Sequence, residues 1–186
     1  MRDLIRKQRV GTLVVDFGVM GQPAFAPDVS RVEVAEAGGA DLARLAGGQH
    51  KDEAMQAMAA GLTAVVRRLH AEGRLDGILG MGGSGGTSIA TAAMRALPVG
   101  VPKVMVSTVG GGDVSAYAGA KDITFIPSIV DVAGLNRISR AIYANAAGAI
   151  AGMVKLKVSN RRMCSTRTRR RRWPGPAPTN WRRMSG

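Results

Sequence analysis

One glycine-rich stretch constrains the fold more than any other part of this chain. Residues 76–96 read DGILGMGGSGGTSIATAAMRA, so an apolar run of strand length passes through glycines into an Ala-rich helix. Glycines let a ligand approach the backbone closely. The first N–H groups of the helix lack internal partners and lie at the positive end of its dipole. A strand, a glycine loop and a helix start are the arrangement in which folds bind phosphate.

The candidate phosphate-binding residues lie in the loop 80–88. Its glycines match the dinucleotide pattern G-x-G-x-x-G literally, but that pattern is weak alone, and no Lys follows as in a Walker A loop. The alternative is a tight turn where a helix packs closely on a strand. Five glycines and three hydroxyls in nine residues favour a ligand site. The candidates are Gly82, Gly83, Ser84, Gly85, Gly86 and Thr87.

A second glycine loop follows the next predicted strand, residues 103–108. The run VGGGD at 109–113 comes directly after KVMVST, and ligands of open parallel sheets bind outside the carboxyl ends of the strands. We therefore expect Ser107, Thr108 and Asp113 at the same edge as the first loop. Asp113 would accept ribose hydroxyls, hold Mg²⁺ or act as a base, unless it is only a turn residue.

The remaining pattern predicts an α/β fold with a doubly wound, mostly parallel sheet. Ser30-x-x-Glu33 is a capping box that starts a short helix. Asp16 lies near the C-terminal end of the apolar run 11–17 and is either a ligand group or a turn or helix-cap acceptor. The expected helices are 1–10 (the end of one), 31–37, 41–46, 51–72 and 138–153, and the further strands are 11–17 and 123–126.

Composition excludes several kinds of protein. The single cysteine, Cys164, excludes an internal disulfide framework and a Cys-based metal site. We expect a cytoplasmic protein, because no apolar run spans a bilayer and no signal peptide is present. His50 and His70 are the only histidines, and no catalytic set can be argued from their spacing. Enzyme activity stays open, with Ser84 as a nucleophile the alternative to phosphate binding.

The net charge of +13 is concentrated at the C-terminal end. Residues 1–154 carry 15 basic and 13 acidic residues, whereas residues 155–186 carry 11 basic residues and no acid. We expect a nucleotide-binding domain at 1–154 and a disordered Arg-rich tail at 155–186. Four arginines at 169–172 with Trp173 and Trp181 suit an RNA-binding arm. A GC-rich gene read out of frame explains the same composition, and either tail binds nucleic acid nonspecifically in low salt.

Two long blocks carry a family resemblance. GILGMGGSGGTSIATAAMRALPVGVPKVMVST and DITFIPSIVDVAGLNRISRAIYANAAGAIAGM resemble the Tm-one-like ATP-binding domain family, whose plant members inhibit replication of tobamovirus RNA. The resemblance covers residues 4–154 and implies the first of two domains, a Rossmann-like layer that binds ATP and forms a homodimer. It implies phosphate contacts from the segment 83–86 and a basic contact from Lys51, where relatives usually show Arg. It also matches the loop that begins at Ser107 and Thr108.

The chain departs from this family in two places. Family members open with a strand and a GTADTK-like loop, so the Rossmann-like sheet is expected to miss its first strand and to leave an unpaired edge. The resemblance also implies a second domain that begins shortly after Met153, and we expect this chain to lack it. We therefore expect an ATP-binding domain, with or without Mg²⁺, from a two-domain protein. An RNA-binding protein acting through the tail is the alternative. A dinucleotide oxidoreductase fits less well, because no acid follows Gly85 by about 20 residues.

Overall fold

The computed structural model describes residues 1–21, 23–47, 51–132 and 134–163. In this part of the chain a parallel sheet has the strand order β1-β2-β3. The strands are β1 (Ile78–Gly82), β2 (Lys103–Ser107) and β3 (Thr124–Pro127). All five residues of β2 are buried, as expected for a central strand that is covered on both faces. The predicted strands 103–108 and 123–126 are confirmed to within a residue or two.

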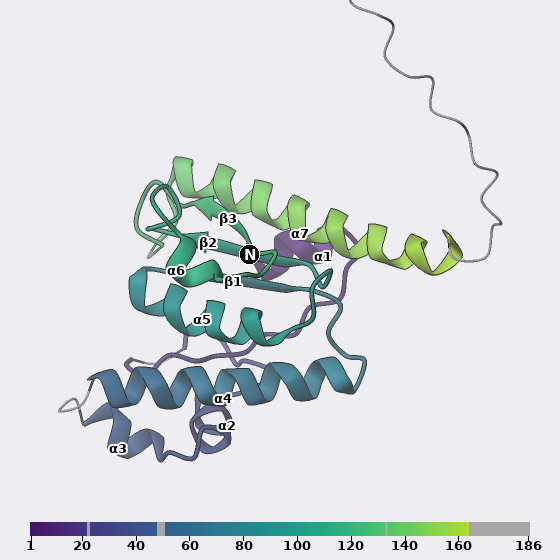
Figure 1. The fold of residues 1–186 in the computed structure, drawn as a ribbon. Coiled ribbons are helices and arrows are strands. Elements are labelled where there is room, and N and C mark those ends of the chain that lie inside the picture. Colours follow the sequence, from purple (N-terminus) through teal and green to yellow (C-terminus); the bar gives the residue numbers. More distant parts are fainter. Residues whose placement is uncertain (22, 48–50, 133, 164–186) are drawn as a thin grey trace, which may run out of the picture.

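Helices cover both faces of this sheet (Figure 1). Val104 and Val106 of β2 pack with Ile150 of α7 on one face, and α1 lies beside α7. Met105 points to the opposite face, where it packs with Met94 of α5, because side chains alternate along a strand. The helices are α1 (Arg2–Lys7), α2 (Arg31–Ala37), α3 (Leu42–Ala46), α4 (Lys51–Ala71), α5 (Ser84–Ala96), α6 (Ser115–Ala118) and α7 (Arg137–Met163). The α/β layer with a parallel sheet is therefore confirmed.

A further helical layer, α2 to α4, packs beyond α5 (Figure 1). The predicted apolar face of α4 is buried, with Met58, Leu62, Val65, Val66 and Leu69 all in one core cluster. The α2–α4 crossing is so close that a Cβ on Gly61 would overlap the carbonyl of Val34. The capping box of α2 is present as predicted, with Ser30 and Glu33 bonded to each other's backbone N–H.

The predicted strand 11–17 is wrong. In this segment only Val15 forms a ladder contact, an isolated parallel bridge to Val29. Leu13, Val15 and Phe17 pack against the core of α2, α4 and α5, and Phe17 also packs against the cluster that contains Met105 of β2. Among the described residues, however, the backbone of this segment pairs with no strand of the sheet. An apolar β-branched run predicts burial, but a strand also needs a partner for its backbone.

Two helix boundaries also differ from the prediction. Helix α5 begins at Ser84, three residues before the predicted start at Thr87, so the last two glycines of the loop belong to its first turn. Helix α7 continues to Met163, past its predicted end at Met153, so the predicted boundary between 154 and 155 falls inside α7. The rest of the predicted tail, residues 164–186, lies outside the described residues.

Candidate functional site

The junction between β1 and α5 forms the centre of the candidate site. Strand β1 ends at Gly82, Gly83 is the N-cap of α5, and no side chain caps this helix. Thr87 makes the first bond of the helix, its N–H donating to the carbonyl of Gly83 at 2.8 Å. The N–H groups before Thr87 therefore have no partner within the helix. With 13 residues, α5 has a dipole whose positive end lies at this junction.

Packing explains two of the five glycines in the loop. A Cβ on Gly80 would lie 2.8 Å from the sulfur of Met105. A Cβ on Gly82 would lie 2.9 Å from the Cα of Gly86, which is backbone and cannot turn aside. The close approach of α5 to β1 therefore requires glycine at position 82, as the tight-turn interpretation predicts. At Gly80 the space is filled by the side chains of Met105, Met94 and Ala90.

Packing does not explain the other three glycines. The nearest atom to a Cβ on Gly83 is Oγ1 of Thr108, at 3.7 Å, and on Gly85 it is Cε of Met55, also at 3.7 Å. A Cβ on Gly86 would lie 3.8 Å from a backbone carbonyl, and none of the three has a positive φ. Glycine in a helix costs about 0.5–1 kcal/mol relative to Ala. This chain bears that cost at Gly85 and Gly86, which lie in the first turn of α5. Gly83 is the N-cap, a position where glycine is itself favoured over alanine.

Two of the candidate hydroxyls, those of Thr87 and Ser107, are buried and connect the two glycine loops. Oγ1 of Thr87 lies 2.7 Å from Oγ of Ser107, and both side chains are fully buried. Oγ of Ser107 also accepts the N–H of Val109 at 3.1 Å, while the N–H of Thr108 donates to the carbonyl of Gly82 at 3.3 Å. The two glycine loops are thus joined, as the sequence predicts. Of the candidate hydroxyl residues, Ser84 and Thr108 are exposed.

The two charged candidates, Asp113 and Lys51, are described to different extents by the structure. The exposed carboxylate of Asp113 accepts the backbone N–H of Ser115 at 2.9 Å, and hydrogen bonding to Ser115 lowers its pKa. Asp113 therefore has the turn role that was one of its predicted alternatives. Lys51 is the first residue of α4, and its side chain lies outside the described residues.

Sequence reasoning missed Met55 as a neighbour of the loop. Its helical spacing assigned it to the core face of α4, yet its Cε is the nearest atom to the Cβ position of Gly85. The available signal was its position one turn after Lys51, the predicted basic contact. The second turn of α4 therefore adjoins the first turn of α5.

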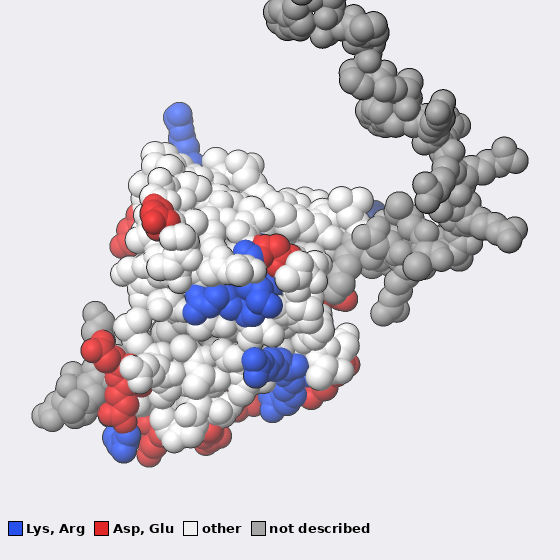
Figure 2. Space-filling model, in the orientation of Figure 1, with Lys and Arg blue, Asp and Glu red and all other residues white. Residues whose placement is uncertain are grey.

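Charge on the described surface is mixed. On the face shown in Figure 2, Lys and Arg are interspersed with Asp and Glu among uncharged residues. No group of three His, Cys, Asp or Glu in the described residues is placed to hold a metal ion. Among the described non-glycine residues only Arg9 and Ile129 have a positive φ. Ser84 therefore does not have the strained backbone of a G-x-S-x-G nucleophile elbow. His50 lies outside the described part.

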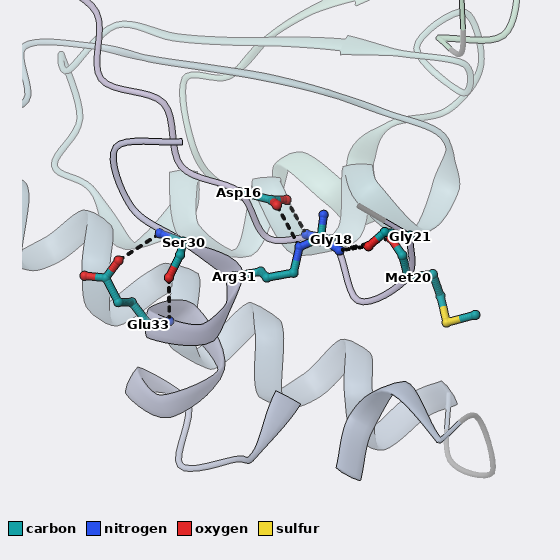
Figure 3. Close-up of polar contacts among 7 residues, drawn as sticks. All are labelled: Asp16, Gly18, Met20, Gly21, Ser30, Arg31 and Glu33. Carbon is teal, nitrogen blue, oxygen red and sulfur yellow. Dashed lines mark hydrogen bonds and ion pairs between the residues drawn. The ribbon is translucent and has the colours of Figure 1, made fainter. Parts of the chain in front are cut away.

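Both carboxylate oxygens of Asp16 accept hydrogen bonds from the protein itself. Its Oδ2 accepts Nε of Arg31 at 2.7 Å and its Oδ1 accepts the N–H of Gly18 at 2.9 Å (Figure 3). Nη1 of Arg31 also donates to the carbonyls of Met20 and Gly21. Both charged side chains are less than one fifth exposed. Of the two predicted roles, the structure shows the acceptor role.

These features define a layered α/β domain with a parallel sheet and a glycine-rich strand–helix junction. The chain belongs to the uncharacterised protein family UPF0261, whose N-terminal domain matches residues 1–159. It is 48% identical over 157 residues to a UPF0261 protein of Clostridium tetani, which is 84% of this chain and 39% of that protein. The family resemblance inferred from the sequence is thereby confirmed.

Other relatives come from bacteria and from a plant. A UPF0261 protein of Brucella suis is 35% identical over 157 residues, 84% of this chain and 38% of that protein. The ToMV resistance protein Tm-1(GCR237) of Solanum lycopersicum is 48% identical over 83 residues, 45% of this chain and 11% of that protein. The chain thus spans less than half the length of the curated relatives it matches. No helix in the described ranges is both long and apolar enough to cross a membrane.

Proposed function

We propose that this domain binds a nucleotide, specifically ATP, and that the phosphates bind to the N–H groups of Gly83, Ser84, Gly85 and Gly86. One observation carries the proposal: three glycines that packing does not require surround the uncapped N-terminus of α5. Unpaired N–H groups and the helix dipole both attract phosphate. A ligand that needs the space of the missing side chains accounts for the cost of keeping glycine at positions 85 and 86.

The surrounding candidates have different roles in this proposal. Thr108, exposed beside Gly83, supplies a hydroxyl to a phosphate, and Lys51 supplies a positive charge from the start of α4. The buried pair Thr87 and Ser107 holds the shape of the two loops. Asp113 remains available to a ribose or to Mg²⁺ through the edge of its carboxylate that Ser115 does not use.

The proposal is tested by calorimetric titration of the full chain with Mg-ATP at physiological salt. The wild type is compared with the double variant Gly83→Asp/Gly85→Asp, which places two acids where phosphate should bind. A matched control is Gly148→Asp/Gly152→Asp on α7, where a Cβ has nothing within 4 Å. All three chains carry the same basic tail, so binding to the tail cannot separate them.

We expect micromolar binding by the wild type and the control and no measurable binding by the loop variant. In the loop variant the two carboxylates repel the phosphate and occupy its space. In the control the two carboxylates lie on α7, away from the loop. A folded wild type that does not bind Mg-ATP would contradict the proposal, and so would a loop variant that binds like the control.

We also propose that this domain acts within a longer, two-domain cytoplasmic protein and forms a homodimer. The support is the family membership and the relatives of more than twice this length. Light scattering on the purified chain measures the assembly directly. A mass of two chains supports the dimer, and a mass of one chain at high concentration contradicts it.

The sheet itself supports a further strand beside β1, as the family resemblance implies. Among the described residues β1 has a ladder partner on one side only, β2, and residues 11–17 have a strand sequence without a ladder. A chain extended at its N-terminus by a relative's preceding segment should melt at a higher temperature and protect the amides of 11–17 from exchange. Unchanged melting and exchange would contradict a missing strand.

A further inference from the structure

Ile129 has a backbone conformation that its side chain disfavours. Its φ is +64°, in the left-handed region that β-branched residues almost never adopt. Its side chain is 74% exposed, so burial of the side chain does not compensate for the strain. Strain of this kind persists where the surrounding structure fixes it, and it is concentrated at ligand sites.

The surrounding structure does fix it. Ser128, only 1% exposed, donates its N–H to the carbonyl of Ser107 at 2.9 Å and its hydroxyl to the carbonyl of Val130 at 2.6 Å. The second bond closes a short turn around Ile129. Since Ser107 is also bonded to Thr87 of α5, the strained residue and the first turn of α5 belong to one hydrogen-bonded network.

The strand register gives the distance between the strand ends that lead to the start of α5 and to Ile129. Gly82, Ser107 and Pro127 lie opposite one another at the carboxyl ends of β1, β2 and β3. Two strand spacings place the end of β3 about 10 Å from the end of β1. Ile129 follows two residues later, at the same edge of the sheet. The separation of these strand ends is of the same order as the reach of a nucleotide from its phosphates to its base.

We propose that Ile129 is a specificity residue that contacts the nucleobase while the phosphates bind at the start of α5. The inference rests on the proposed function, since it takes the phosphate position from there. An aliphatic side chain suits the apolar face of a base. The strained turn holds that side chain in solvent, where a bound ligand is able to cover it.

The test compares two ligands, Mg-ATP and inorganic tripolyphosphate, which has the phosphates but no base. In the full chain Ile129→Gly removes the side chain and the strain together, and Ile129→Asn keeps a side chain that tolerates this conformation. Val99→Gly is the matched control, because Val99 is 71% exposed in the loop that precedes β2, at the opposite edge of the sheet.

Both Ile129 variants should bind Mg-ATP about tenfold more weakly, the size of one lost aliphatic contact, and tripolyphosphate as tightly as the wild type. Ile129→Gly should also melt no lower than the wild type. An unchanged affinity for Mg-ATP, or an equal loss for both ligands, would overturn the inference. A wild type that binds neither ligand would overturn the proposed function as well. A wild type that binds both ligands, with Ile129 variants that bind Mg-ATP equally well, would overturn only the role of Ile129.

Discussion

Replacing the unexplained glycines by alanine should stabilise the fold and weaken nucleotide binding. The double variant Gly85→Ala/Gly86→Ala adds two Cβ atoms whose nearest neighbours lie at 3.7 and 3.8 Å, ordinary contact distances. Each replacement gains about 0.5–1 kcal/mol of helix stability. Because 1 kcal/mol shifts the melting temperature of a domain of this size by about 2–4 °C, the variant should melt about 4 °C higher than the wild type.

The same two methyl groups occupy the space into which a phosphate would approach the backbone. Affinity for Mg-ATP should therefore fall at least tenfold in calorimetric titration, while thermal unfolding followed by circular dichroism shows the gain in stability. Gly82→Ala is the internal reference, because its Cβ meets backbone at 2.9 Å and should cost about 1–3 kcal/mol.

Either of two results would show that these glycines do not mark a phosphate site. If Gly85→Ala/Gly86→Ala melts lower than the wild type, packing does require these glycines and they are no longer evidence for a ligand. If the variant is more stable but binds Mg-ATP as tightly as the wild type, the space beside the helix start is not used by the ligand.

Two predictions concern stability alone. Gly61→Ala should lower the melting temperature by several degrees, at a cost of about 3 kcal/mol, because its Cβ would overlap the carbonyl of Val34; an unchanged melting temperature would show that α2 moves aside freely. Burial acts to raise the pKa of Asp122, but hydrogen bonds from Lys103 and from the N–H of Gly100 outweigh it and leave that pKa lowered. The stabilisation is therefore present above the unfolded pKa, about 4, and is lost as pH falls through the folded value. Asp122→Asn should be less stable at neutral pH and lose less stability on acidification, and identical acid-unfolding curves would contradict this.

Local signals were predicted well from the sequence. The capping box at Ser30 and Glu33 is made within four residues, so its sequence pattern determines its geometry. The junction of β1 and α5 was also placed correctly, because a strand-length apolar run and an Ala-rich helix leave only the glycines between them. The helix start was missed by three residues, since Gly85 and Gly86 have low helix propensity that packing against β1 and α4 overrides.

Features that depend on distant partners were not predictable. Residues 11–17 have the composition of a strand, but strand formation depends on a neighbour that local sequence does not reveal. The role of Asp16 is decided by Arg31, fifteen residues away. Ile129 offers no local signal at all, because isoleucine is among the residues least expected at positive φ; only the bonds of Ser128 to other elements impose that conformation.

The amide resonances of Gly83, Ser84, Gly85 and Gly86 test the central claim most directly. In the full 19.4-kDa chain, two-dimensional NMR can follow every backbone N–H as Mg-ATP is added at physiological salt. A phosphate bound at the start of α5 should shift these four signals first and most strongly, with saturation at micromolar ligand. Unmoved signals from these residues, with shifts confined to the arginines after residue 163, would contradict the account and assign the binding to nonspecific contact with the basic tail.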